Sequence, residues 1–275
     1  MNSEAPIVSV VLPAWDRYAQ APLLEALQSL RGQDLISQII VVDNASESPL
    51  PELTDVELVR APRRLTVGAA RNLGLEAARA PYVAFWDADD LMPPGTLRFL
   101  HERISNRSDV VAVSSSILED EPRVLHRWPR PWARRLARLP RAFAFANSVW
   151  SLFPTVGGTL MRTDAVRACG GYADIDGGED WVLGVSLAFR GQVELHERPG
   201  RIYGRRVGSM WEGWRSLPQL AHHATEVRHR MQSDPGVPAW ARGLLPLVAV
   251  LQVAALGPHR LLRLVRSREL RSPKP

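Results

Sequence analysis

The chain has 275 residues, which is long enough to bury a large core, and its 45% hydrophobic and 23% charged residues are typical of a soluble globular protein. The formal net charge of +5 comes almost entirely from arginine, because Lys274 is the only lysine. The single cysteine, Cys169, excludes an intramolecular disulfide and a zinc site built on cysteines. No stretch reaches the roughly 20 apolar residues that a membrane span needs.

Predicted strands and helices alternate along the first third of the chain. Runs rich in β-branched residues predict buried strands at 7–15, 37–46, 56–60 and 82–86. Apolar residues at helical spacing predict helices at 22–31, which opens with a proline, and at 67–80. This alternation predicts a parallel, doubly wound sheet, and the ligands of such sheets bind beyond the carboxyl ends of the strands.

Three carboxylates follow the last of these strands. They are Asp87, Asp89 and Asp90 in the sequence YVAFWDADD, and like charges so close together repel one another unless a cation lies among them. Carboxylate oxygens suit Mg²⁺ or Mn²⁺, and proteins usually hold magnesium with one or two carboxylates together with substrate phosphates. The alternative interpretation is an acidic loop in which Asp90 caps the next helix.

Other residues in the same region favour a phosphate-bearing ligand. Asp43 also stands at a predicted strand end, and Arg71 and Asn72 lie on the helix that leads to the strand before Asp87. A guanidinium there could meet a diphosphate through two parallel hydrogen bonds. The chain lacks the glycine patterns of the dinucleotide-binding fold and of the P-loop, so neither of those phosphate sites is expected.

Four segments together resemble a known family. They are VSVVLPAWDR, IIVVDNAS, GAARNLGLEAARAPYVAFWDADD and GGYADIDGGEDW, and in this order and at these distances they are similar to the inverting family 2 glycosyltransferases of the GT-A fold. The resemblance covers roughly residues 7–210. It implies an α/β fold of the GT-A type, with a doubly wound, mostly parallel sheet flanked by helices and a C-terminal helical appendage.

The same resemblance implies a reaction and a role for each matching residue. The reaction is transfer of a sugar from a nucleotide-diphosphate sugar to an acceptor hydroxyl, assisted by Mg²⁺ or Mn²⁺. Asp180 would be the general base, with Glu179 beside it as the alternative base, and Asp89 would be a more direct metal ligand than Asp87. The nucleotide-sugar site would contain Pro13, Ala14, Asp16, Asp43, Arg71, Asn72, Asp87 and Ala88.

These roles are chemically coherent. Inversion at the anomeric carbon needs a base on the face opposite the leaving diphosphate, while cations stabilise the charge that develops on the leaving group. The alternative interpretation of Glu179 and Asp180 is a pair of acids that stabilises the first turn of a helix.

The chain departs from the family at Arg206, where many relatives have histidine. Imidazole can ligate a metal, whereas guanidinium can only contact phosphate. Arg206 is therefore predicted to bind the nucleotide-sugar, and the metal is predicted to have fewer protein ligands. The alternative is a solvated basic loop.

The expected domains are a glycosyltransferase domain at 1–215, divided near residue 118 into a nucleotide-sugar half and an acceptor half, and a helical, amphipathic extension at 216–275.

Two basic segments raise the question of a membrane. The first, predicted to face the acceptor, carries Arg127, Arg130, Arg134, Arg135, Arg138 and Arg141 among Trp128, Trp132, Leu136 and Leu139. It suits an anionic or lipid-linked acceptor, a bilayer surface or an ordinary solvated loop. In the second, an apolar stretch at 244–256 precedes a basic amphipathic segment with Arg260, Arg263 and Arg266, which is compatible with a bilayer surface or a homodimer contact.

The expected location is the cytoplasm, with the inner face of the cell membrane as an open possibility. The first apolar run is strand-sized and follows no positive segment, so no signal peptide is expected, and no nucleic-acid module is recognised. Two other functions stay open: a nucleotidyltransferase of related fold, although PAWDRYAQ is not the glycine-rich loop that a triphosphate needs, and a nucleotide-sugar-binding scaffold without turnover.

Overall fold

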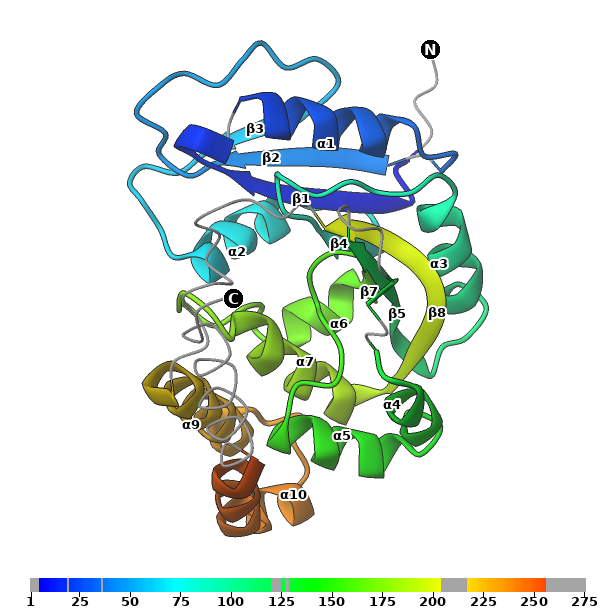
Figure 1. Cartoon of the computed structure of the whole chain (residues 1–275), viewed down its shortest axis with the longest axis vertical. Helices are drawn as coiled ribbons and strands as arrows, with labels where there is room; N and C mark the ends of the chain where they lie inside the picture. The colour runs from blue at the N-terminus through cyan, green and yellow to red at the C-terminus, as the bar shows by residue number, and fades with distance from the viewer. Residues whose placement is uncertain are drawn as a thin grey trace, which may run out of the picture.

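The computed structural model of the protein describes residues 5–18, 20–35, 37–119, 125–126, 129–203 and 217–255 (Figure 1). The strands are β1 (Val8–Ala14), β2 (Ser37–Asp43), β3 (Glu57–Arg60), β4 (Tyr82–Phe85), β5 (Val110–Glu119), β6 (Leu125–His126), β7 (Thr159–Arg162) and β8 (Gln192–Tyr203). They form one sheet with the order β3-β2-β1-β4-β7-β5-β6, in which β8 also pairs with β5.

The sheet is parallel in its first half and mixed in its second. β1 pairs in parallel with both β2 and β4, and β2 with β3, as the alternation of strands and helices predicts. β7 runs antiparallel to β4 and to β5, whereas β8 is parallel to β5. The carboxyl ends of β1, β2 and β4 therefore meet at one edge of the sheet.

Helices cover both faces of the sheet, because alternate residues of each strand point to opposite sides. Val10 belongs to one hydrophobic cluster with Leu27 and Leu97, while Val11 belongs to another with Ala70 and Leu183. The helices are η1 (Asp16–Tyr18), α1 (Ala21–Arg31), α2 (Val67–Ala77), α3 (Thr96–Ile104), α4 (Pro131–Leu136), α5 (Pro140–Val149), α6 (Thr163–Ala168), α7 (Glu179–Arg190), α9 (Leu217–Ser233) and α10 (Ala239–Gly243). Thus α1 and α3 cover one face, and α2 and α7 the other (Figure 1).

The C-terminal helices pack against α7. A third hydrophobic cluster joins Trp181 and Val185 of α7 to Val227 and Met231 of α9, and it includes Val248 in the helical segment 245–255. The predicted fold class, a doubly wound α/β sheet followed by C-terminal helices, is confirmed. The boundary at residue 215 stays a prediction. None of the helices in the described residues has both the length and the apolar character needed to cross a membrane.

Candidate active site

The predicted strand-end residues lie together at the carboxyl edge of the parallel strands. Ala14 at the end of β1 is in register with Asp43 at the end of β2, and Asp87 follows β4 on the other side of β1. Pro13 and Ala14 are largely buried, so they can contribute backbone and little side-chain surface. The structure therefore brings three of the expected nucleotide-site segments to one edge.

Asp43 is engaged in the turn that follows β2. Its carboxylate is 1% exposed, with Oδ1 accepting from the N–H of Ser46 at 2.9 Å and Oδ2 paired with Arg60 Nη1 at 3.0 Å. Asp16 ties the end of β1 to the same turn, because its Oδ1 accepts from the N–H of Glu47 at 2.9 Å and its own N–H donates to Ser46 Oγ. These two aspartates fix the shape of the turn after β2, at the edge where the nucleotide is expected.

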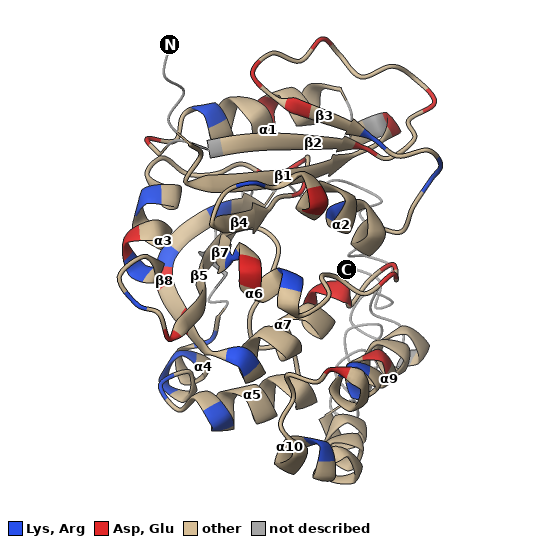
Figure 2. Ribbon diagram, turned by 180° about the vertical axis from the view of Figure 1, so that it is seen from behind, with Lys and Arg blue, Asp and Glu red and all other residues tan. Residues whose placement is uncertain are grey.

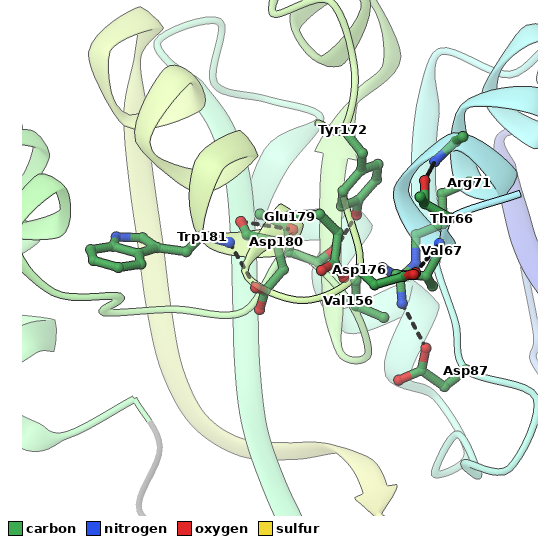
Figure 3. Close-up of polar contacts among 12 residues, drawn as sticks. Thr66, Val67, Arg71, Asp87, Val156, Tyr172, Asp176, Glu179, Asp180 and Trp181 are labelled. Carbon is green, nitrogen blue, oxygen red and sulfur yellow. Dashed lines mark hydrogen bonds and ion pairs between the residues drawn. The ribbon is translucent and has the colours of Figure 1, made fainter. Parts of the chain in front are cut away.

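Arg71 is the central cation of the site. It lies on α2, its Nη1 donates to Glu179 Oε1 at 2.5 Å, and its Nη2 donates to Asp87 Oδ1 at 2.9 Å (Figure 3). Burial disfavours the charged guanidinium, but the carboxylates of Glu179 and Asp87 outweigh it and raise the pKa of Arg71 above its ordinary value. Arg71 therefore stays charged and connects the two acidic motifs that are far apart in sequence.

Asn72, the neighbour of Arg71, holds the loop before α7. Its Nδ2 donates to the carbonyl of Tyr172 at 2.9 Å, and its Oδ1 accepts from the N–H of Tyr172 at 2.8 Å. The same loop is tied to the start of α2, where the N–H of Val67 donates to Asp176 Oδ1 at 2.9 Å (Figure 3). The sequence analysis expected Asn72 at the nucleotide, and in the structure its amide is occupied by this loop.

Asp87 lies between two arginines. Besides the contact with Arg71, its Oδ2 accepts from Nη2 of Arg201 at 2.8 Å, and Arg201 also forms an ion pair with Asp90. Burial would raise the pKa of Asp87, but Arg71 and Arg201 together lower it, so this carboxylate is ionised. The sequence analysis expected positive charge among the three aspartates, and two guanidinium groups of the chain itself supply some of it.

Arg201 was missed by the sequence analysis. It lies on β8, 114 residues from Asp87, in a segment with no motif. Its Nη1 donates to the carbonyl of Val156, and the guanidinium passes over Gly157, which has φ 68°. A Cβ at Gly157 would lie 2.3 Å from Arg201 Cδ, so only glycine allows this approach. No local pattern could have revealed Arg201, although the glycine pair in TVGGT was a signal of a close backbone approach.

The assignment of Asp89 and Asp87 as ligands of a divalent cation stays a prediction. Both oxygens of Asp87 accept from arginines, and within the described residues no three His, Cys, Asp or Glu side chains are grouped to hold a metal. Asp89 is half-buried on the loop after β4. Because magnesium needs only one or two carboxylates when phosphates supply further oxygens, Asp89 suits such an ion together with a diphosphate. Ala88 is buried and offers no polar side chain.

Glu179 and Asp180 open α7 but have different surroundings. Glu179 is 2% exposed, and burial raises its pKa to about 7, although Arg71 opposes the shift. Asp180 is partly exposed, and its Oδ1 accepts from the N–H of Trp181 at 2.7 Å (Figure 3). Burial also raises the pKa of Asp180 above its ordinary value. Asp180 is thus the carboxylate of the pair that a ligand can reach.

A glycine sets the direction of α7. Gly178, the residue before Glu179, has φ 75°, and a Cβ there would lie 2.5 Å from the His223 ring of α9. Trp181, in the first turn of α7, contacts the opposite neighbour: its Nε1 donates to the carbonyl of Asn147 on α5. The start of α7 is therefore fixed from both α9 and α5.

Several residues singled out in the sequence lie outside the described residues. They are Arg206, Arg127, Trp128 and the basic tail with Arg260, Arg263 and Arg266.

Comparisons with known proteins show relatives of this chain. The family model described as glycosyl transferase family 2 matches residues 9–169. The succinoglycan biosynthesis protein ExoO of Rhizobium meliloti (strain 1021) is 27% identical over 227 residues, which are 75% of this chain and 63% of that protein. The putative glycosyltransferase EpsH of Bacillus subtilis (strain 168) is 29% identical over 117 residues, 39% of this chain and 33% of that protein.

Solved structures show the same fold. The crystal structure of S. aureus TarS 1-349 in complex with UDP-GlcNAc superposes with a TM-score of 0.67 at 14% identity, covering 90% of this chain and 71% of that one. The complex of the same protein with UDP gives a TM-score of 0.61 at 13% identity. At such identities the likeness concerns the fold, and the chain spans less than two thirds of the curated relatives named above.

Proposed function

The chain belongs to glycosyl transferase family 2. We propose that it is a nucleotide-sugar-dependent glycosyltransferase that transfers the sugar with inversion, and that Asp180 is the general base. The observation that carries the proposal is the position of Asp180, which is partly exposed at the start of α7, while Glu179 beside it is buried against Arg71. The family match favours this function over the nucleotidyltransferase that the sequence left open.

In the proposed step the acceptor hydroxyl gives its proton to Asp180 while its oxygen attacks the anomeric carbon. The bond from that carbon to the diphosphate oxygen breaks, and the electron pair leaves with the diphosphate. One oxygen of Asp180 is held by the helix N–H of Trp181, which leaves the other to take the proton. A raised pKa brings a carboxylate closer to the working pH of a base, which favours proton transfer.

Arg71 and Asp87 would also hold this base in position. Arg71 joins Glu179 to Asp87, so the start of α7 and the loop after β4 keep a fixed relation. A divalent cation at Asp89, bound with the donor phosphates, would neutralise charge on the leaving diphosphate. Asp87 would keep its two arginines and contribute as part of the frame.

The donor and acceptor are proposed from the neighbours and from charge. The TarS structure was solved with UDP-GlcNAc, which supports a UDP-linked sugar as donor, with Pro13, Ala14, Asp16 and Asp43 forming its nucleotide edge. The name of ExoO assigns that protein to succinoglycan biosynthesis, which supports a saccharide acceptor. The arginines between residues 127 and 141 support an acceptor that is anionic or lipid-linked. We also propose that the protein contacts the inner face of the cell membrane peripherally, or forms a homodimer through its C-terminal helices.

The test is the configuration of the product. The chain would be incubated with a panel of UDP-sugars and a saccharide acceptor, and proton NMR would record the anomeric configuration as product forms. We expect the product configuration to be opposite to that of the donor. A product with the donor's configuration would contradict a single displacement assisted by Asp180.

A further inference from the structure

The surface formed by α4 and α5 is basic and partly apolar. Four arginines on or beside these helices are exposed, together with Trp132 at 53% and Leu139 at 61% exposure, and we call this surface the basic patch: Arg130, Arg135, Arg138, Arg141, Trp132 and Leu139. Figure 2 shows α4 and α5 marked with blue and free of red. The sequence agrees, because no Asp or Glu occurs between Glu121 and Asp164.

Among the described residues, no carboxylate forms an ion pair with the arginines of the basic patch. Within the described residues only Arg134 on these helices forms an ion pair, with Glu197 of the β8 strand. The four arginines of the patch form none there, in contrast to Arg79 and Arg98 on other surfaces, which pair with Glu57 and Asp34. Within the part of the chain that the structure describes, the patch thus combines arginines that form no ion pair with an exposed indole.

The opposite side of the two helices is fixed in the core. Ala133, Ala137, Phe143 and Ala144 are buried in the same cluster as the sheet residues, and Phe143 packs against Phe153 with ring centroids 5.9 Å apart. The outward face is therefore presented on a firm support. An outward face that combines arginine with tryptophan and leucine is the pattern of a segment that lies at the boundary between lipid headgroups and acyl chains.

The helix α5 connects this surface to the candidate base. It begins at Pro140 beside the basic patch and ends near Asn147, whose carbonyl accepts from Trp181 at 2.5 Å. Trp181 follows Asp180 in sequence. A helix of ten residues spans about 15 Å, so α5 leads over roughly that length from the edge of the patch to the contact with Trp181.

We propose that the basic patch docks on the surface of a bilayer that contains anionic lipids. The arginines contact lipid phosphates, while Trp132 and Leu139 enter the interface between headgroups and acyl chains. Docking would place an acceptor anchored in that bilayer on the side of the molecule from which α5 leads to Trp181, the neighbour of Asp180. Only this last consequence rests on the proposed function, since the docking itself depends on surface charge and exposed apolar groups.

The test is sedimentation of the full chain with vesicles made of equal parts phosphatidylcholine and phosphatidylglycerol, and with pure phosphatidylcholine vesicles. The wild-type chain should bind the first kind and release as salt rises. The variant Arg135→Gln/Arg138→Gln/Arg141→Gln should bind roughly a hundredfold more weakly, because each arginine near an anionic surface contributes about one factor of five. The matched control, Arg31→Gln/Arg79→Gln/Arg103→Gln, removes equal charge from exposed positions outside the patch and should bind nearly as the wild type does.

A second variant separates charge from insertion. Trp132→Ala keeps every arginine and should weaken vesicle binding roughly tenfold, with little change in its salt dependence. Three outcomes would overturn the proposal. Vesicle binding could weaken equally in the triple variant of the patch and in the control triple variant, or it could stay unchanged in the triple variant of the patch. The third outcome is equal binding of the wild type to both kinds of vesicle. Thermal stabilisation of each variant by a UDP-sugar is the control that the variant is folded. Failure of sugar transfer alone would count against the proposed function and would leave the docking result intact.

Discussion

Replacing Arg201 with methionine would remove one guanidinium from two carboxylates at once. Asp90 is 0% exposed and Asp87 is shared with Arg71, so the variant leaves a buried carboxylate without its arginine. Breaking a buried pair by removing one partner costs about 3–5 kcal/mol. For a chain of this size about 1 kcal/mol lowers Tm by roughly 2–4 °C, so we expect a fall of at least about 6 °C.

The assay is chemical denaturation followed by circular dichroism, with two comparison variants. Arg79→Met removes an arginine from its pair with Glu57, in which the Arg79 side chain is 64% exposed, and should cost no more than about 1 kcal/mol. Asp90→Asn in the Arg201→Met background removes the charge that Arg201 neutralised and should recover part of the loss, because the two changes are coupled. A cost for Arg201→Met no larger than that for Arg79→Met, or no coupling to Asp90, would refute the assignment of Arg201 as the internal cation of this cluster.

Three further predictions concern metal, pH and the tail. Asp89→Asn should weaken UDP-sugar binding mainly when Mg²⁺ or Mn²⁺ is present, measured by calorimetry with and without chelator; equal affinity and full turnover would exclude Asp89 as a ligand. Burial raises the pKa of Glu179 from 4.5 to about 7, so the free energy of unfolding of the wild type relative to Glu179→Gln should fall as pH rises through this window. A difference in unfolding free energy that stays constant from pH 4.5 to 7 would contradict the shift. Removing residues 256–275 should reduce recovery with anionic vesicles and leave donor hydrolysis intact, whereas truncation from residue 244 should also destabilise the chain, because Val248 and Gln252 are buried.

The strand-end part of the site could be predicted because its physical cause is local. The runs before Asp43 and Asp87 are buried strands, and parallel strands that alternate with helices must bring their carboxyl ends to one edge. The start of α7 at Glu179 is equally local, since glycines precede an amphipathic run. These features follow from neighbours in sequence, so a pattern of residues carries them.

The partners of those residues could not be predicted in the same way. Arg201 and Asp87 are 114 residues apart, and the contact depends on the path of β8 and on the space above Gly157. Asn72 was expected at a ligand because it stands beside Arg71, but its side chain turns to the loop at Tyr172. The antiparallel insertion of β7 between β4 and β5 likewise joins strands that are distant in sequence. Long-range packing decides these contacts, and local propensity does not encode it.

The most direct test of the account is the turnover of Asp180→Asn with saturating UDP-sugar and acceptor, relative to the wild type. Asparagine keeps the shape and the contact with the N–H of Trp181 but cannot take the acceptor proton. General bases contribute about a hundredfold to ten-thousandfold, so we expect turnover to fall by at least about a hundredfold while the affinity for the UDP-sugar stays close to that of the wild type. A fall of less than about tenfold would show that the base lies elsewhere, with Glu179 as the next candidate, and loss of UDP-sugar affinity instead would place Asp180 in the donor site and contradict the mechanism.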